Sequence, residues 1–239
     1  MNIKKDKIAL VTGATKGMGR AISIALAREG YKIIACARNH DSLKQLQTDI
    51  LNEVSNSEVL TRRCDFSIPA QVNELTTWLE TNSLHVDVLV NNVGLFIPGS
   101  ILNEAADVLA KHMQVNLFAP HHLSVYLGRK MRERKSGHIF NISSIASRNA
   151  VVTAGSYSVT KYALAGLTAI LREELKKDNV KVTEIIPGST LTSSWEGTTV
   201  SKDEFVLPED IAQALLSILN MSPGANVDEI IIKPIKGQI

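Results

Sequence analysis

Short runs of β-branched and aliphatic residues alternate along this chain with longer segments in which apolar residues recur every three or four positions. The runs have the composition of buried strands, and the spacing between them is typical of amphipathic helices. In RAISIALAREG, for example, apolar residues stand at 22, 25 and 26, and Gly30 predicts the end of a helix. The predicted strands are residues 7–12, 32–37, 58–64, 87–92, 137–143, 180–187 and 228–234.

This alternation predicts an α/β fold. Strands that are almost continuously apolar are buried on both faces, which requires a parallel sheet with helices on both sides. Right-handed crossovers then give a Rossmann-type, doubly wound sheet of seven strands, with a binding crevice outside the carboxyl ends of the strands. The chain has 239 residues without repeats or linkers, so we expect a single domain over residues 1–239.

Composition narrows the classes of partner. Hydrophobic residues make up 44% and charged residues 21% of the chain, as in ordinary globular proteins, and a net charge of +2 argues against a nucleic-acid partner. The basic cluster at 128–137 lacks interleaved aromatic residues and is predicted to end a helix. The sequence has neither an apolar signal region nor a run of about 20 apolar residues. We therefore expect a cytoplasmic protein with no membrane partner.

The cysteines and histidines give no sign of a disulfide framework or a metal centre. Cys36 and Cys64 each end a strand-like run, so buried reduced thiols are expected. The six histidines lack metal-ligand spacing, and the adjacent His121 and His122 point to different sides of any helix. We predict no metal site.

A glycine-rich turn follows the first predicted strand. In TGATKGMG, glycines at 13, 17 and 19 let the backbone approach a pyrophosphate, and the N–H groups at the start of the next helix bind the anion. After the second strand, ACARN offers no carboxylate for a ribose hydroxyl. Arg38 and Lys16 instead predict a pocket for a 2′-phosphate. The alternative is that both are solvated surface cations.

The stretch SYSVTKYALAG contains a phenol and an ammonium four positions apart. Tyr157 and Lys161 therefore lie on one face of a helix, one turn apart. A fixed ammonium stabilises phenolate, so the pair predicts a lowered pKa for Tyr157, suited to proton transfer near neutrality. The alternative is that the tyrosine completes a core and the lysine is solvated.

In this order, the motifs resemble those of the classical short-chain dehydrogenase/reductase family over residues 5 to about 235. TGATKGMG is similar to the glycine motif, NNVG at 91–94 to Asn-Asn-Ala-Gly, and NISS with YSVTK to the catalytic Ser and Tyr-x-x-x-Lys. The resemblance implies a catalytic set of Asn116, Ser144, Tyr157 and Lys161. It also implies the cofactor-binding residues Gly13, Thr15, Lys16, Gly17, Met18, Gly19, Arg38, Asp65, Phe66, Asn92, Gly94, Tyr157, Lys161, Pro187, Gly188, Thr190 and Thr192.

The resemblance assigns a role to each catalytic residue. Tyr157 supplies the proton, and Lys161 also binds the nicotinamide ribose. Ser144, thirteen residues before Tyr157, binds the substrate carbonyl. Strand alternation supports Ser144 over Ser143, for which a buried backbone partner is the alternative. Asn116 holds a water that relays protons to Lys161.

Two residues outside the catalytic set are less settled. Asp65 is expected to accept a hydrogen bond from the adenine amino group, with a helix N-cap as its alternative role. Val93 replaces the family's usual alanine and adds bulk beside the cofactor.

These observations predict an NADPH-dependent reductase of a small-molecule carbonyl substrate. Residues 189–207 are expected to form a short substrate lid, apolar mainly at Trp195 and Phe205, which favours small or medium ketones. The alternative is a 3-oxoacyl carrier-protein reductase, although the closing Gly-Gly typical of those enzymes is missing. A non-catalytic NADP-binding sensor and a methyltransferase fit less well, because the Tyr-x-x-x-Lys motif is intact.

A homodimer or homotetramer is also expected, through the helices that carry Asn116 and Tyr157. The small residues Ala163, Ala165, Gly166 and Ala169 allow another helix to approach closely. The alternative is that they pack tightly on the protomer's own sheet.

Overall fold

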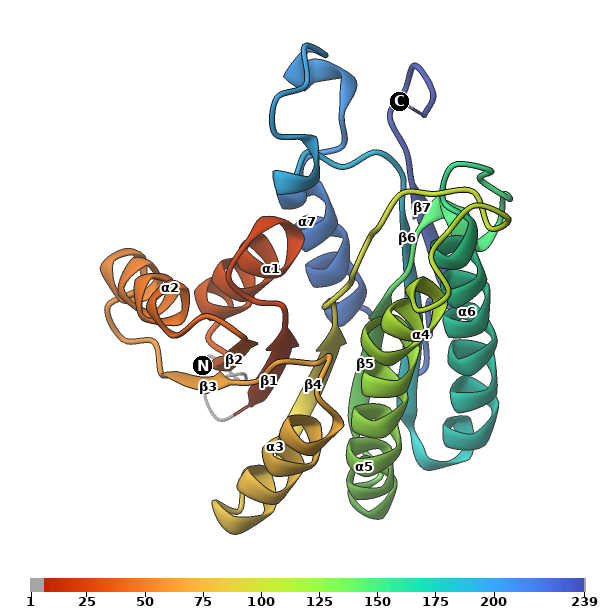
Figure 1. Cartoon of the computed structure of the whole chain (residues 1–239). Helices are drawn as coiled ribbons and strands as arrows, with labels where there is room; N and C mark the ends of the chain where they lie inside the picture. Colours follow the sequence, from red (N-terminus) through yellow and green to blue (C-terminus); the bar gives the residue numbers. More distant parts are fainter. Residues whose placement is uncertain (1–6, 239) are drawn as a thin grey trace.

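The computed structural model describes residues 7–238, so the outermost residues of the predicted 1–239 domain lie outside it. Its strands form one parallel seven-stranded sheet in the order β3-β2-β1-β4-β5-β6-β7 (Figure 1). This confirms the predicted doubly wound topology. The strands are β1 (Ile8–Thr12), β2 (Lys32–Ala37), β3 (Val59–Arg63), β4 (Val86–Asn91), β5 (Gly137–Ile142), β6 (Val180–Pro187) and β7 (Glu229–Ile232).

Helices cover both faces of the sheet, as the continuous apolar strands require. One face carries α1 (Gly17–Arg28), α2 (His40–Glu53) and α7 (Pro208–Leu219). The other carries α3 (Pro69–Thr81), α5 (Ala119–Arg134) and α6 (Gly155–Leu175). The short α4 (Val108–Met113) continues through a π-helical turn, Gln114–Phe118, directly into α5.

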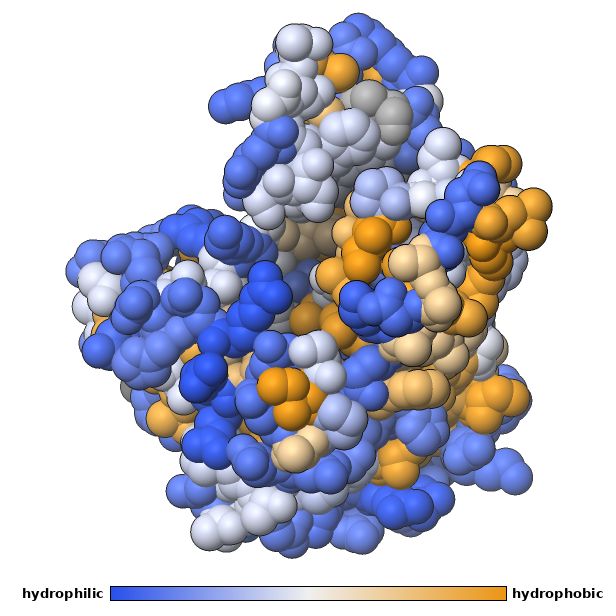
Figure 2. Space-filling view, viewed as in Figure 1, coloured by the Kyte–Doolittle hydropathy of each residue, from blue (hydrophilic) through white to orange (hydrophobic). Residues whose placement is uncertain are grey.

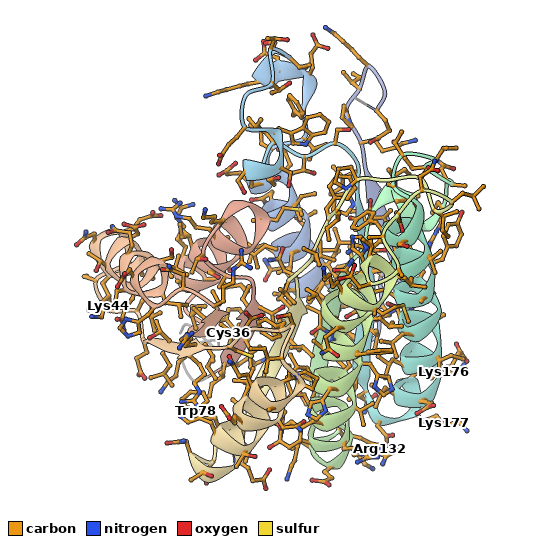
Figure 3. All side chains as sticks on the ribbon, in the orientation of Figure 1. Cys36, Lys44, Trp78, Arg132, Lys176 and Lys177 are labelled. Atoms are coloured by element: carbon orange, nitrogen blue, oxygen red, sulfur yellow. The ribbon has the colours of Figure 1, made fainter. Side chains whose placement is uncertain are left out.

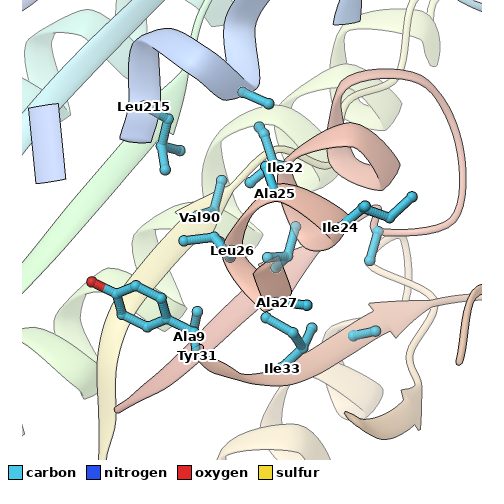
Figure 4. Packing of buried hydrophobic residues seen from close by; sticks show 14 of the residues in the cluster. Ala9, Ile22, Ile24, Ala25, Leu26, Ala27, Tyr31, Ile33, Val90 and Leu215 are labelled. Atoms are coloured by element: carbon cyan, nitrogen blue, oxygen red, sulfur yellow. The ribbon is translucent and has the colours of Figure 1, made fainter. Parts of the chain in front are cut away.

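The sheet divides the hydrophobic core into two clusters. Figure 4 shows part of the first, where Ile22 and Leu26 of α1 are grouped with Val90 of β4 and Leu215 of α7, all fully buried. Burying a side chain of this kind contributes about 1.5–3 kcal/mol. The core therefore holds the strand ends that follow in a fixed arrangement.

Local signals in the sequence have the expected outcomes. Gly30 follows the end of α1 with a φ angle of +88°, in the left-handed region that suits glycine. The basic cluster ends α5, and Arg132 lies with Lys176 and Lys177 at the lower end of the molecule in Figure 3. Cys36, also labelled there, and Cys64 are buried free thiols. None of the helices in residues 7–238 is both long and apolar enough to cross a lipid bilayer.

The predicted motifs gather at the carboxyl edge of the sheet. The first residues after β1, β4, β5 and β6 are Gly13, Asn92, Ser143 and Gly188. Above this edge stands the segment 189–207, which we call the lid. Figure 1 shows it beyond α7, and Figure 2 shows a hollow between it and the body of the molecule.

Candidate active site

The glycine-rich turn between β1 and α1 has open backbone where the sequence predicts a pyrophosphate. Gly13 and Gly17 have φ angles of +63° and +49°, which glycine adopts without strain. A Cβ atom on Gly19 would stand 2.2 Å from the carbonyl oxygen of Gly13. Lys16, the N-cap residue of α1, makes no side-chain hydrogen bond to the first turn, so the N–H groups there can bind an anion. These residues fit a dinucleotide.

Asn92 fastens this turn to the end of β4. Its amide donates to the carbonyl oxygens of Thr12 and Gly13 at 2.9 and 3.2 Å. The Thr12 hydroxyl accepts from the backbone N–H groups of Asn92 and Val93, both at 3.0 Å. Val93 is half-buried and packs on the second hydrophobic cluster, which accommodates its extra bulk. The Asn92 side chain therefore shapes the turn through contacts with the protein itself.

Two cations stand at the predicted adenosine end. The Lys16 and Arg38 side chains are exposed, and neither donates a hydrogen bond to another residue in the range 7–238. The Arg38 charge nevertheless helps to lower the pKa of Asp65. Both cations can therefore receive an anionic group without breaking an existing hydrogen bond.

Asp65 closes a turn just after β3. One carboxylate oxygen accepts from the Ser67 N–H at 2.9 Å and from the Ser67 hydroxyl at 2.7 Å. These bonds lower its pKa. Helix α3 begins at Pro69 with Ile68 as its N-cap, so Asp65 is not the helix cap that was its alternative role. Phe66 beside it is buried, and the contact of Asp65 with adenine stays a prediction.

Tyr157 lies in the first turn of α6, and Ser144 is close enough to its hydroxyl to act on the pKa of the phenol. The edge of the Phe96 ring packs on it at a centroid distance of 5.0 Å and an angle of 84°. Ser143 behaves differently. Its backbone N–H donates to Ile185 of β6 at 2.8 Å, while its buried hydroxyl has no partner among the described residues. Of the two serines, Ser144 is therefore the one that acts on the phenol, and its contact with a substrate carbonyl stays a prediction.

Lys161 lies one turn further along α6, close to Tyr157. Its buried ammonium donates to the carbonyl oxygen of Ile142 at 3.0 Å and lies 5.6 Å from the centroid of the Tyr157 ring. This rules out a solvated lysine.

The expected lowering of the tyrosine pKa is wrong for the groups present. Burial raises the pKa of Tyr157, and Ser144 offsets only part of that effect. Burial also lowers the pKa of Lys161 to about 8, against the opposing charge of the buried Glu184. Loss of hydration penalises both charged forms, and spacing along a helix does not reveal how dry the site is.

Asn116 occupies the π-helical turn between α4 and α5. Its side-chain oxygen accepts from the Leu95 N–H at 2.7 Å, and its amide donates to the Leu95 carbonyl at 2.9 Å and to the Thr160 hydroxyl at 3.1 Å. Such turns occur frequently at functional sites. Because both ends of the amide already have partners, the side chain holds Leu95 and α6 together. The proposed water relay stays a prediction.

A carboxylate from a distant loop fixes the start of the catalytic helix. Glu104 accepts from the backbone N–H of Ser156 at 3.0 Å and from its hydroxyl. Ala154, the N-cap residue, provides no side-chain cap of its own. A negative charge at a helix N-terminus is stabilising. Glu104 therefore ties the loop after β4 to the turn that carries Tyr157.

Two cavities meet at Tyr157. We call the first, of about 310 Å³, the cofactor cleft, because predicted cofactor-binding residues line it, and the second, of about 500 Å³, the substrate pocket. Predicted residues lining the cleft are Gly13, Lys16, Gly17, Met18, Asn92, Gly94, Tyr157, Lys161 and Thr192. Those lining the pocket are Met18, Ser144, Tyr157, Pro187, Gly188, Thr190 and Thr192. Thr15, Gly19, Arg38, Asp65, Phe66 and Asn116 line neither cavity.

Some residues that line the two cavities were not predicted from the sequence. Phe96 and Ser194 line both cavities, and Gln238 lines the substrate pocket. Phe96 stands two residues after NNVG, so its position near the cofactor motif was a usable signal. Gln238 gave none, because it reaches the pocket only when the chain after β7 folds back.

Comparison with known proteins agrees with this geometry. The family model of the short chain dehydrogenases matches residues 7–202. The chain belongs to this family. An oxidoreductase of Staphylococcus aureus strain MRSA252 is 32% identical, with 98% of this chain and 100% of that protein covered. Membership of the short-chain dehydrogenases makes the protein an oxidoreductase by family.

Solved structures of the family superpose over nearly the whole chain. A metagenomic short-chain oxidoreductase in complex with NADP has 28% identity and a TM-score of 0.84, covering 97% of this chain and 98% of its own. The actinorhodin polyketide ketoreductase with NADPH has 25% identity and a TM-score of 0.86, covering 98% of both chains. These likenesses agree with the observed sheet order and strand connections.

Proposed function

We propose that this protein reduces a small-molecule ketone or 3-oxo compound to an alcohol with NADPH as the reductant. One observation carries the proposal: Tyr157 forms a wall common to the cofactor cleft and the substrate pocket. A proton donor at that junction can reach a substrate carbonyl while the carbonyl carbon faces the cleft. Ketone reduction in the ketoreductase relative and NADP in the metagenomic relative support the same reaction class.

In this proposal, one set of residues binds the cofactor and another donates the proton to the substrate. The glycine turn holds the pyrophosphate, and Lys161 with Thr192 faces the nicotinamide end of the cleft. When bound, the cofactor supplies the hydride. Ser144 donates to the carbonyl oxygen, and Tyr157 gives its proton to the alkoxide that forms there.

The raised pKa of Tyr157 suits this direction of reaction. At neutral pH the side chain stays a phenol, so it is loaded with the proton that reduction consumes. The pKa of Lys161, lowered to about 8, means that its ammonium is lost above that pH. Reduction is therefore expected to decline as the pH rises past about 8, because the charge that stabilises the developing phenolate disappears.

Replacing the phenol tests the proposal. Tyr157→Phe keeps the ring and its contact with Phe96 but removes the proton, so ketone-dependent NADPH oxidation should fall by about a hundredfold to ten-thousandfold. NADPH binding, measured by titration, should be nearly unchanged. Tyr162→Phe is the matched control, since Tyr162 lies on the same helix with 46% exposure, and it should keep full activity. Activity of Tyr157→Phe above about a tenth of wild type would refute the assignment.

The substrate pocket and the lid also support a choice of substrate size. The pocket walls are largely apolar, with contributions from Met18, Phe96, Ile145, Val151 and Trp195. Apart from Trp195, the two 3-10 turns of the lid, Ser193–Trp195 and Lys202–Glu204, consist of polar residues. Small or medium ketones should be preferred. Catalytic efficiency that rose steadily with acyl length would favour a 3-oxoacyl thioester reductase instead.

We also propose a homodimer or homotetramer that uses the outer faces of α4, α5 and α6. A Cβ atom on Gly166 would meet nothing within 4 Å, and Ile170 is 60% exposed, so these two residues, which form a stripe on α6, do not pack on the protomer's own sheet. Phe118 is exposed on the neighbouring π-helical turn. Light scattering should give a multiple of 26.1 kDa for the wild type.

A charged residue on the stripe sharpens this test. Ile170→Glu should shift the mass to that of a monomer, because an unpaired charge would be buried at the contact. Ile235→Glu, at a residue 98% exposed after β7, should not change the mass. A wild-type protein that scattered as a monomer at micromolar concentration would overturn the proposed assembly.

A further inference from the structure

Gln238 lies on the wall of the substrate pocket, although it is 49 positions along the chain from Ser189, which it contacts. Its carboxamide packs directly over Gly188, where a Cβ atom would stand 2.4 Å from the Gln238 nitrogen Nε2. The Gly188 N–H donates to the carbonyl oxygen of Ile232 in β7 at 2.7 Å. This bond places the end of β7, and with it the residues after Ile232, beside the pocket.

The segment 233–238 after β7 is bent back toward the pocket by a specific turn. Gly237 has a φ angle of +107°, which side-chain-bearing residues rarely adopt, and its N–H donates to the carbonyl oxygen of Pro234 at 3.1 Å. The Lys236 ammonium lies 3.8 Å from a carboxylate oxygen of Glu204 in the lid. This turn aims the next side chain, that of Gln238, at the mouth of the pocket.

Hydrogen bonds fix the orientation of the Gln238 amide. Its oxygen accepts from the Ser189 N–H at 2.8 Å and from the Ser189 hydroxyl at 3.1 Å. A backbone N–H can only donate, so the atom facing it must be the oxygen Oε1. The nitrogen Nε2 then presents its N–H groups elsewhere, and no acceptor in residues 7–238 takes them.

We propose that Gln238 is a specificity-determining residue, whose Nε2 donates to a second oxygen of the substrate while Ser144 and Tyr157 hold the reacting carbonyl. The other walls are largely apolar, with serine and threonine hydroxyls as their remaining polar groups, and Gln238 adds an amide donor. A substrate oxygen placed beside it keeps a hydrogen-bonding partner in place of water. The inference rests on the proposed ketone reduction. The preferred substrates are ketones with an additional acceptor oxygen, such as 3-oxo esters, diketones and hydroxyketones.

A substrate pair tests this preference. Methyl acetoacetate carries the second oxygen, and 2-hexanone is a ketone of similar length without it. Gln238→Glu keeps an oxygen for Ser189 but replaces the donor with an acceptor, so the ratio of kcat/KM for the ester over the ketone should fall about threefold to thirtyfold. The loss should appear mainly in KM for the ester. Comparing ratios between variants cancels the difference in intrinsic reactivity of the two ketones.

Two further variants separate recognition from other effects. Gln238→Met, which removes the donor without adding charge, should lower the same ratio. Gln213→Glu adds the same charge at an exposed position of α7 and should leave the ratio unchanged. NADPH affinity, titrated in parallel, should be equal in all four proteins.

The outcomes distinguish this inference from the proposed function. If the wild type reduced neither substrate, both would be overturned together. If it reduced both and the Gln238 variants kept the wild-type ratio, only the inference would be wrong. An equal loss for both substrates, or a loss of NADPH affinity alone, would show instead that Gln238 supports the Pro-Gly segment.

Discussion

The floor and the roof of the substrate pocket are held in different ways. The floor consists of Ser144, just after a central strand, and Tyr157, in the first turn of a long helix, with Lys161 one turn further along on the side of the cofactor cleft. The lid and the segment 233–238 form the roof. Their attachments include the Leu191–Val206 backbone hydrogen bond at 2.9 Å, the bonds from Ser189 to Gln238, the packing of two aromatic rings in the lid, and one ion pair.

This difference in attachment separates the residues that transfer the proton from the residues that recognise the substrate. Proton transfer needs groups fixed to within a fraction of an ångström, which a packed strand end and helix provide. Recognition of the rest of the substrate tolerates irregular chain, and open loops exchange residues without disturbing the core. We therefore expect substitutions in the floor to affect turnover and global stability, and substitutions in the roof to affect mainly the choice of substrate.

The largest effect is expected at Lys161. Lys161→Met should lower turnover by about a hundredfold or more, because the charge that supports proton transfer is lost. The same variant should be more stable at pH 7 by about 1–3 kcal/mol, since burial lowers the pKa of Lys161 to about 8 and its charged form is costly in the fold.

The sign of this stability difference can be followed with pH. The cost of the buried charge is fully present below pH 8, so the wild type should gain stability relative to the variant as the pH rises from about 8 to 10.5. Chemical denaturation of both proteins across that range measures it. Lys44→Met, at an exposed lysine on α2 (Figure 3), is the matched control and should show no such trend. A variant less stable than wild type at pH 7 would contradict the assigned burial cost.

Two glycines compare the rigid cofactor turn with the contact between the Pro-Gly segment and the roof. Gly19→Ala would place a Cβ atom 2.2 Å from a backbone oxygen, which cannot move without distorting the cofactor turn. We expect a loss of about 1–3 kcal/mol in the free energy of unfolding, together with weaker NADPH binding. Gly188→Ala meets only the Gln238 amide, a flexible side chain. It should leave stability nearly unchanged but alter the preference between methyl acetoacetate and 2-hexanone. Equal destabilisation by both changes would show that Gln238 of the roof is held as rigidly as the cofactor turn.

The smallest change in affinity is expected at the exposed cations of the predicted adenosine end. Arg38→Ala should weaken NADPH by about tenfold and NADH hardly at all, because a charge-assisted hydrogen bond to the 2′-phosphate is lost while solvent and salt screen the remainder. Ala37→Asp should repel the phosphate and improve NADH binding. Titration of both cofactors into each protein checks this. An Arg38→Ala loss shared by the two cofactors would mean that the arginine is only a solvated surface group.

The sequence by itself determined the elements and the local geometry of the site. Seven apolar runs predicted seven parallel strands to within two residues at either end, because buried strands must be continuously apolar. Gly30 marked a helix end, and the spacing of Tyr157 and Lys161 placed both on one face, since each depends only on neighbours along the chain. The thirteen-residue offset also selected Ser144 over Ser143.

Only the tertiary structure decided how these groups behave. The Tyr157 pKa is raised rather than lowered, because desolvation depends on what distant segments pack around the phenol. The Asn116 amide proved to be occupied by Leu95 and Thr160, which no spacing rule indicates. Gln238 reaches the pocket only because β7 adds to the edge of the sheet and a left-handed glycine turns the chain back. Such contacts join residues far apart in sequence, and the closing of long loops leaves no periodic signal in the chain.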